Sequence, residues 1–111
     1  MSGPEIVSSE VFPLKPHNSP AAKVPGLIFC SGQIGNGEIE AATALLELGG
    51  SSLEQIVKIN IFMKDINQFN AMNEVFSKFL PNPKPARTCI QAGKLPGGET
   101  STIEIECIAR V

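Results

Sequence analysis

Two stretches of the chain alternate apolar and polar residues with a period of two, the pattern of strands that bury one face. The first is residues 57–64, with apolar side chains at Val57, Ile59, Ile61 and Met63. The second is residues 102–111, where the odd positions from Ile103 onward are apolar. Shorter apolar runs, rich in β-forming side chains, occupy residues 6–12, 27–34 and 86–92. The pattern therefore predicts strands in all of these segments.

Two other segments repeat apolar residues at the three- and four-residue spacings of an amphipathic helix. In residues 38–48 the apolar side chains are Ile39, Ala42, Leu45, Leu46 and Leu48, and Gly49-Gly50 follows as a helix end. Residues 66–79 follow Asp65, a favourable N-cap, and their apolar stripe is Ile66, Phe69, Met72, Phe76 and Phe79. Both stripes are interpreted as core-facing, because amphipathic helices usually pack inward.

The element order ββαβαββ predicts an α+β fold, a mixed β-sheet with two helices on one face. The first two strands are separated by a stretch that we interpret as loop, since it contains Pro13, Pro16, Pro20 and Pro25. Residues 1–111 are expected to form one domain, because the length is near the common domain size of about 100–150 residues. The second sheet face also carries apolar residues, so we expect it to pack against another subunit.

Charge and composition disfavour several classes of function. The net charge is −2, no run of Lys or Arg stands out, and Trp and Tyr are absent, so nucleic-acid binding is disfavoured. No apolar run approaches the roughly 20 residues that span a bilayer. The N-terminus has neither a signal-peptide core nor an Arg-rich leader. We therefore expect a cytoplasmic protein without a membrane partner, with a mitochondrial location as the alternative.

The cysteines do not point to a disulfide framework or to a metal site. Cys30, Cys89 and Cys107 are odd in number, and no pair has metal-ligand spacing. The single histidine, His17, lies in the proline-rich stretch and is a poor candidate for a catalytic base. The simplest interpretation of the cysteines is buried, reduced core residues.

Polar residues on the two C-terminal strands are the strongest candidates for chemistry. Arg87, Cys89 and Gln91 share one face of their strand, and Glu104 and Glu106 share a face of the last strand. If these strands pair as a hairpin, Arg87 and Glu104 can line one pocket. Arginine grips a carboxylate through two parallel hydrogen bonds, and a partly buried Glu can exchange a proton with water. A structural cross-strand ion pair is the alternative, and spacing alone does not choose between the two.

Several segments, in this order, resemble the reactive intermediate deaminase family (RidA/YjgF). Residues 27–34, LIFCSGQI, resemble its SGQ strand, and residues 57–67, VKINIFMKDIN, resemble its next strand and turn. Residues 69–76, FNAMNEVF, resemble its second helix. Residues 85–89, PARTC, resemble its PAR(S/T)C signature, and residues 103–109, IEIECIA, resemble its last strand. The resemblance spans residues 27–111.

The resemblance implies a chorismate-mutase-like fold, related to the ferredoxin-like fold, and a homotrimer with active sites between subunits. It implies hydrolysis of 2-iminobutanoate or 2-iminopropanoate to the 2-keto acid and ammonia, without a metal or organic cofactor. By the same resemblance, Arg87 binds the substrate carboxylate and Glu104 activates water. Backbone groups of Cys89 contact the substrate, and the pocket lining includes Asn73, Ser31 and Gly32.

The chain departs from the family pattern in two places. No GPYSQA-type segment with a covering aromatic residue precedes residues 27–34, and only residues 35–50 stand where the family has a longer loop and first helix. A non-catalytic oligomer that binds keto acids, or acts in stress protection or translation regulation, is therefore the alternative function. An RNA-acting protein is a third, which the acidic balance disfavours.

Overall fold

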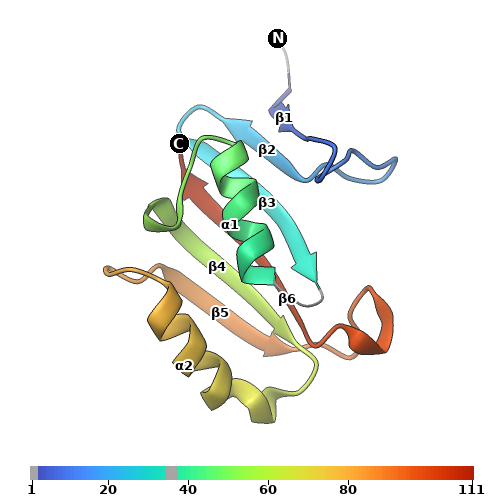
Figure 1. The fold of residues 1–111 in the computed structure, drawn as a ribbon, viewed down its shortest axis with the longest axis vertical. Helices are drawn as coiled ribbons and strands as arrows, with labels where there is room; N and C mark the ends of the chain where they lie inside the picture. The colour runs from blue at the N-terminus through green and yellow to red at the C-terminus, as the bar shows by residue number, and fades with distance from the viewer. Residues whose placement is uncertain (1–2, 35–37) are drawn as a thin grey trace.

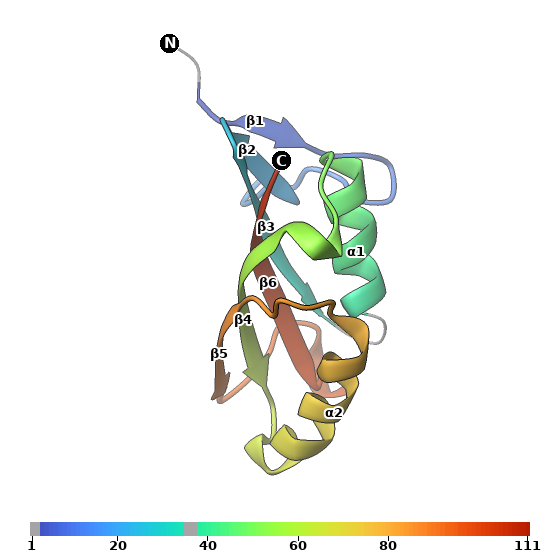
Figure 2. The ribbon, with the colours of Figure 1, turned by 90° about the vertical axis from the view of Figure 1, so that its left-hand side faces the viewer.

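A computed structural model describes residues 3–34 and 38–111 of the protein. It contains one six-stranded sheet with both helices on the same face (Figures 1 and 2). The strands are β1 (Glu5–Val7), β2 (Ala21–Val24), β3 (Leu27–Ile34), β4 (Ile56–Met63), β5 (Ala86–Gln91) and β6 (Ile103–Arg110). The helices are α1 (Glu38–Leu48) and α2 (Phe69–Phe79). Across the sheet the order is β1-β2-β3-β6-β4-β5, with β4 and β5 parallel and the other pairs antiparallel.

The α+β class and the mixed sheet with two helices on one face are confirmed, but the predicted order ββαβαββ lacks a strand. The missing strand is β2, which forms a hairpin with β3. Pro25-Gly26 makes the turn, where Gly26 has a φ of 86° that other residues rarely adopt. The prolines at positions 20 and 25 lie just outside β2, so they interrupt no ladder bond. The loop prediction was therefore wrong for these four residues.

The predicted first strand, residues 6–12, is shorter than expected. Only Glu5–Val7 pairs with β2, and the chain then leaves the sheet. A tight turn explains this, because Ser9 and Phe12 bond to each other: Ser9 N donates to Phe12 O at 2.8 Å, and Phe12 N donates to Ser9 Oγ at 3.1 Å. Phe12 packs against the edge of the core from outside the sheet.

The helices begin and end close to the predicted positions. Helix α1 matches its predicted range, and Gly50 ends it with a φ of 86° while Ser51 N donates to Leu46 O at 2.8 Å. Helix α2 is preceded by a 3₁₀ turn, Ile66–Gln68. Asp65 caps this turn, because its Oδ1 accepts a hydrogen bond from Asn67 N at 2.9 Å. The Asp65 cap is therefore confirmed.

The core lies between the helices and the odd positions of β4 and β6. Its largest fully buried side chains are Ile28, Leu45, Leu46, Ile59 and Ile61. Some residues predicted to face it are exposed instead. Leu48 lies about 110° around the helix from the centre of the buried stripe of α1, at 100° per residue. Val57 lies at an irregularity in the β4–β6 pairing. Ile66 precedes α2, and Phe79 is in its last, half-free turn. The side chain of Ile39 is outside the described residues.

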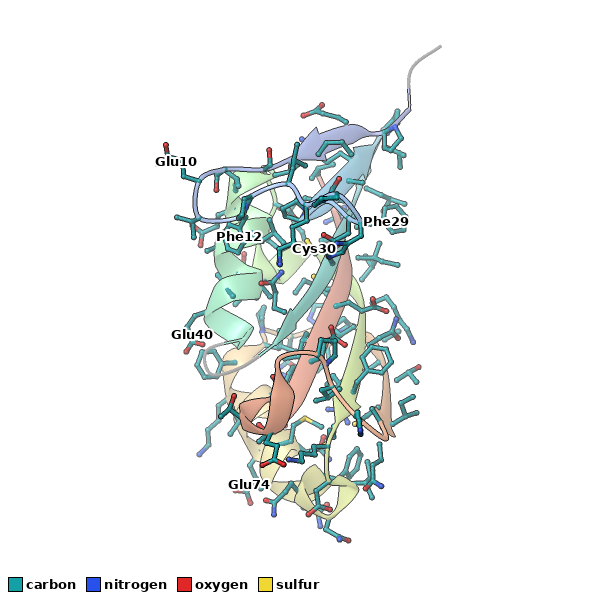
Figure 3. All side chains as sticks on the ribbon, turned by 90° about the vertical axis from the view of Figure 1, so that its right-hand side faces the viewer. Glu10, Phe12, Phe29, Cys30, Glu40 and Glu74 are labelled. Atoms are coloured by element: carbon teal, nitrogen blue, oxygen red, sulfur yellow. The ribbon has the colours of Figure 1, made fainter. Side chains whose placement is uncertain are left out.

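The opposite face of the sheet carries no helix. Phe29 and Cys30 point to opposite sides of β3, so Phe29 belongs to this uncovered face and Cys30 to the core (Figure 3). Phe29 is 42% exposed and Ile90 is 50% exposed. The expectation that another subunit covers this face stays a prediction.

The three cysteines are free thiols. Cys30 and Cys107 are buried, as their core assignment predicted. They lie opposite each other on β3 and β6. The Cys107 thiol, together with burial, raises the pKa of Cys30, so this thiol stays protonated. Cys89 is only half-buried, because β5 is the edge strand and has a neighbour on one side only. The prediction of full burial was therefore wrong for Cys89.

Candidate active site

Arg87 lies in a pocket of about 400 Å³ between α2 and the start of β5. The pocket is lined by Asn73, Phe76, Ser77, Leu80, Lys84, Pro85 and Arg87. Two side chains of α2 hold the guanidinium: the Phe69 ring lies 5.5 Å below it, and Met72 Sδ accepts from Nη1 at 3.8 Å. Cation–π contact and a weak sulfur acceptor orient an arginine without neutralising it. Arg87 is therefore a positioned cation.

Asn73, which lines the Arg87 pocket, also carries a buried polar atom that lacks a partner. Asn73 Oδ1 is buried and accepts no hydrogen bond in the structure. Within the described residues, no carboxylate forms an ion pair with Arg87. A buried oxygen without a donor is destabilising by about 1–3 kcal/mol, so such atoms commonly mark a place where a ligand donates. Asn73 and Arg87 together form a pocket suited to a small anion that also carries N–H groups.

Cys89 presents its backbone rather than its thiol to the outer edge of the sheet. In a parallel strand pair, the backbone groups of every second residue bond to the neighbouring strand. Ala92 N donates to Met63 O at 2.8 Å, so the even-numbered residues of β5 bond to β4. Cys89 is an odd-numbered residue of this edge strand, so its N–H and C=O point away from β4, toward the free edge of the sheet. Burial raises the pKa of the Cys89 thiol, against the opposing effect of the Arg87 cation. A protonated thiol is a poor nucleophile.

Glu104 lies in a second pocket, of about 460 Å³. This pocket is beside the end of β3, which extends beyond the residues that pair with β2. Its lining includes Ser31, Gly32, Phe12 and Glu104. The β3–β6 register shifts between Cys30 and Gln33, and this bulge brings Gly32 against the Glu104 side chain. A Cβ at position 32 would lie 2.7 Å from Glu104 Cδ. The glycine is therefore required for the carboxylate to occupy this position.

The pKa of the Glu104 carboxyl is raised, which favours proton exchange. Partial burial raises its pKa above the ordinary value, and repulsion by Glu106 raises it further. Glu106 is held nearby because Asn60 Nδ2 donates to its Oε1 at 3.0 Å. A carboxyl whose pKa is raised toward neutrality takes up and returns a proton more readily near pH 7.

Ser31 anchors the loop that forms the far wall of this pocket. Its Oγ donates to Ser19 O at 2.6 Å, and its N–H donates to Pro20 O at 2.8 Å. The loop contributes Phe12, Lys15 and His17 to the lining. The sequence interpretation missed these residues and dismissed His17. The signal that could have found them is the Pro25-Gly26 turn, because the β2–β3 hairpin fixes the loop beside Ser31.

Arg87 and Glu104 do not share a pocket within one chain. Strand β4 lies between β5 and β6, so the predicted hairpin is wrong. Arg87 pairs with Ile59 on the helix-covered face, whereas Glu104 pairs with Phe62 on the open face. The segment that connects β5 to β6, residues 92–102, is longer than a tight hairpin turn. It carries the chain past β4, so that β6 pairs on the far side of β4. The alternative, a cross-strand ion pair between these two residues, is excluded by the same register.

The expected site residues therefore fall into two groups that we call half-sites. The arginine half-site is Arg87, Asn73 and the edge of Cys89, and the glutamate half-site is Glu104, Ser31 and Gly32. Residues 8–111 match the model of a protein family described as Endoribonuclease L-PSP. The chain belongs to this family, which is the YjgF/RidA family.

Known family members resemble the chain over nearly its whole length. Protein mmf2, mitochondrial, of Schizosaccharomyces pombe is 48% identical over 125 positions, which cover 98% of each chain. Reactive Intermediate Deaminase A, chloroplastic, of Arabidopsis thaliana is 34% identical over 95% of this chain and 65% of its own length. The match to mmf2 extends over more positions than the 111 residues of this chain, so mmf2 carries segments that this YjgF/RidA protein lacks.

Solved structures of the family share the fold. The yeast protein YEO7 superposes with a TM-score of 0.86 at 35% identity, over 96% of this chain and 97% of its own. TdcF of Escherichia coli with bound serine superposes with a TM-score of 0.80 at 27% identity, over 96% and 98% of the two chains. The chorismate-mutase-like fold is consistent with these neighbours.

The expected cytoplasmic location gains no support from these relatives, since mmf2 is named as a mitochondrial protein. Within the described residues, no helix has the length and apolarity to cross a bilayer. The same residues contain no cluster of three His, Cys, Asp or Glu side chains able to hold a metal ion.

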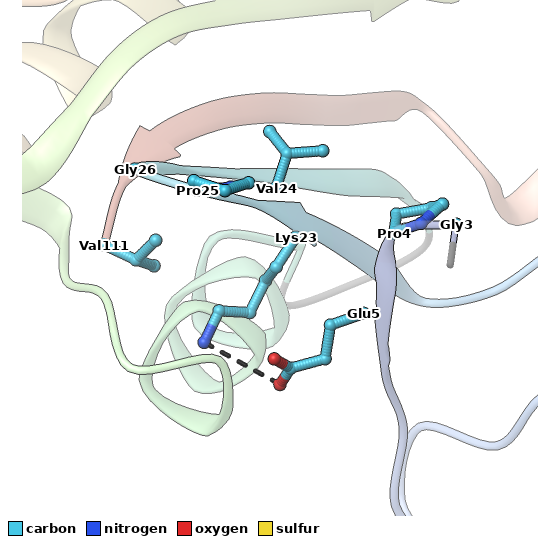
Figure 4. A pocket seen from close by; sticks show the side chains of 8 residues that line it. All are labelled: Gly3, Pro4, Glu5, Lys23, Val24, Pro25, Gly26 and Val111. Atoms are coloured by element: carbon cyan, nitrogen blue, oxygen red, sulfur yellow. Dashed lines mark ion pairs between the residues drawn. The ribbon is translucent and has the colours of Figure 1, made fainter. Parts of the chain in front are cut away.

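Two other pockets of this YjgF/RidA chain contain little chemistry. One lies at the opposite end of β3 and β6 from Glu104, where Lys23 Nζ meets Glu5 Oε2 at 4.0 Å in an exposed ion pair (Figure 4). The other, of about 780 Å³, opens between α2 and the ends of β4 and β6 and is mainly apolar. Neither combines a cation, a proton-exchanging group and an unpartnered polar atom.

Replacing Gly32 with alanine is expected to lower kcat/KM at least tenfold on an imine substrate, because the new Cβ displaces the Glu104 carboxylate. The melting temperature should change little, since Glu104 can rotate toward solvent. Gly93→Ala is the matched control, because a Cβ there meets no atom within 4 Å. Full activity of Gly32→Ala would mean that the carboxylate position is unimportant.

Proposed function

We propose that the protein hydrolyses small 2-imino acids to 2-keto acids and ammonia. The observation that carries this proposal is the pair of half-sites. One holds an arginine that forms no ion pair with a carboxylate among residues 3–34 and 38–111, and the other holds a carboxyl with a raised pKa. A 2-imino acid needs both, because it has a carboxylate to bind and a C=N carbon to hydrate. The kinship with Reactive Intermediate Deaminase A supports the same reaction.

In the proposed reaction the substrate binds through its carboxylate to the Arg87 guanidinium, which offers two parallel N–H groups. Asn73 Oδ1 accepts from the imine N–H, which gives this buried oxygen its partner. The outward N–H of Cys89 is a further donor for the carboxylate. These contacts hold the C=N carbon at the mouth of the arginine half-site.

Glu104 then activates water. The carboxylate takes one proton from a water molecule as the water oxygen bonds to the C=N carbon, and it passes this proton to the imine nitrogen, which gives a carbinolamine. The carbinolamine collapses when Glu104 takes the hydroxyl proton and transfers it to the amine, so that the C=O bond forms as the C–N bond breaks and ammonia leaves. The keto acid, R–CO–COO⁻, remains on Arg87. One water is consumed, and Glu104 is regenerated without a metal or organic cofactor.

The two half-sites face opposite sides of one chain, so we propose that a complete site forms between two copies, in a homotrimer. The exposed apolar residues of the open face, among them Phe29 and Ile90, supply a surface for this contact. The free edge of β5 would then lie at the subunit boundary. TdcF, a neighbour in fold, binds serine, a small molecule with the same carboxylate and nitrogen arrangement.

Mixing two inactive variants tests this sharing. In co-expressed mixtures of Arg87→Ala and Glu104→Gln chains, about one quarter of the sites would combine an intact Arg87 with an intact Glu104, if cyclic assembly is random. We expect activity to return to about that fraction of the wild-type value. Mixtures that stay as inactive as the separate variants would contradict a site built from two copies.

The proposed reaction is tested by a coupled assay. Threonine dehydratase generates 2-iminobutanoate from threonine in the presence of semicarbazide, which traps the imine. The protein should divert the imine to free 2-ketobutanoate and lower the amount of semicarbazone. A folded trimer that gives no diversion would instead favour the second candidate, a non-catalytic oligomer that binds keto acids. The segments that mmf2 has and this chain lacks favour that candidate.

A further inference from the structure

The loop beside Glu104 brings two basic side chains to the glutamate half-site. Lys15 and His17 line the same pocket as Glu104, and the remaining loop residues that line it are uncharged. An aliphatic side chain, such as that of 2-iminobutanoate, gains nothing from such neighbours. The two basic groups therefore need a chemical explanation that the hydrolysis of simple imines does not supply.

The turn that carries these groups is fixed at both ends. Lys15 N donates to Asn18 O at 3.1 Å and Asn18 N donates to Lys15 O at 3.3 Å, which closes the turn. The next residues are tied to Ser31 through the 2.6 Å bond to Ser19 O. Prolines at positions 13, 16 and 20 limit the backbone further. A basic turn held in this way is pre-organised for an anion.

The geometry of a bound substrate limits where that anion can be. The carboxylate next to the C=N carbon is taken by Arg87 of the other half-site, and the C=N carbon lies at Glu104. A side chain that extends from this carbon into the Glu104 pocket would meet the turn, because Lys15 and His17 line the same pocket. Glu104 would repel a second carboxylate there, unless the Lys15 ammonium offsets its charge and the His17 imidazole donates a hydrogen bond to that carboxylate.

Resting on the proposed deaminase function, we propose that Lys15 and His17 select 2-imino acids whose side chain carries a second carboxylate. The substrate class is the dicarboxylic imines, represented by 2-iminosuccinate and 2-iminoglutarate. Lys15 and His17 are specificity-determining residues in this assignment. The chemistry at the C=N carbon is the same for the dicarboxylic and the monocarboxylic imines.

The test compares two imines made in place by an L-amino acid oxidase, 2-iminoglutarate from glutamate and 2-iminopropanoate from alanine. The ratio of their kcat/KM values should favour the dicarboxylic imine in the wild type. In the double variant Lys15→Gln with His17→Gln, this ratio should fall about tenfold or more, with little change for 2-iminopropanoate. Lys78→Gln is the matched control, because it removes an exposed Lys of α2 that lines neither half-site.

The outcomes separate this inference from the proposed function. Hydrolysis of 2-iminopropanoate together with an unchanged ratio in the double variant overturns the selectivity and leaves the deaminase intact. If no imine is hydrolysed, calorimetry with 2-oxoglutarate and 2-oxobutanoate decides the selectivity alone. If the wild type binds 2-oxoglutarate more tightly than 2-oxobutanoate and the double variant does not, the role of Lys15 and His17 is supported. If the wild type binds both keto acids equally, that role is overturned.

Discussion

Replacing Arg87 with alanine is expected to lower kcat/KM on 2-iminobutanoate by about 10²–10⁴-fold, since each hydrogen bond to a charged group is worth about 1.5–3 kcal/mol and the guanidinium supplies two. Most of the loss should be in KM, because the substrate carboxylate binds before the chemical step. The folded structure should persist, since Arg87 is exposed and its guanidinium is held by the Phe69 ring and Met72 Sδ rather than by a buried ion pair among the described residues. Steady-state kinetics and sizing on the same sample measure both effects.

Two further variants show whether charge or shape is responsible. Arg87→Lys keeps the charge without the planar fork, so it should recover part of the lost affinity but not all of it. Arg110→Ala removes an exposed arginine at the far end of β6 and should leave kcat/KM unchanged. If Arg87→Ala binds keto acids as tightly as the wild type, the carboxylate is bound elsewhere.

The fold could be predicted from the sequence wherever burial is one-sided and the period is clear. In β4 and β6, burial at every second residue repeats the alternation of the sequence, because the sheet has one covered face. Strand β2 was missed because its four residues between prolines are too few to show a period. The position of β6 was missed because period and spacing say which face a residue occupies, but not which strand is its neighbour.

The same limit explains what was missed in the candidate site. The structure divides the candidate residues between two half-sites. Arg87 and Glu104 were chosen by strand period and charge, whereas Asn73 and the role of Cys89 were chosen by resemblance to a family. Gly32 was chosen in the same way, but its physical reason is visible only in three dimensions, where it makes room for Glu104. Lys15 and His17 were overlooked because only the hairpin and the Ser31 anchor bring their loop to Glu104.

Replacing Glu104 with glutamine is expected to lower kcat by about 10²–10⁴-fold, the usual contribution of a general acid–base group. The stability of the fold should not fall. The pKa of Glu104 is raised in the folded state, so near neutral pH the ionised carboxyl lowers the free energy of unfolding. This destabilisation diminishes as the pH falls toward the ordinary pKa of a glutamate. Glutamine keeps the shape without the charge. Kinetics and a melting curve at pH 7 measure the two effects, and a lower melting temperature would point to a structural role.

Glu106→Gln is the matched variant for this site, because glutamine can still accept the bond from Asn60 while the negative charge is lost. Glu104 acts as a base in its ionised form, so kcat/KM of the wild type should fall as the pH drops through the raised pKa of Glu104. Removing the Glu106 charge lowers that pKa, so the acidic limb of the pH profile should move to lower pH while the plateau is kept. An acidic limb that stays in place in Glu106→Gln, or one that survives in Glu104→Gln, would assign the titrating group to another residue.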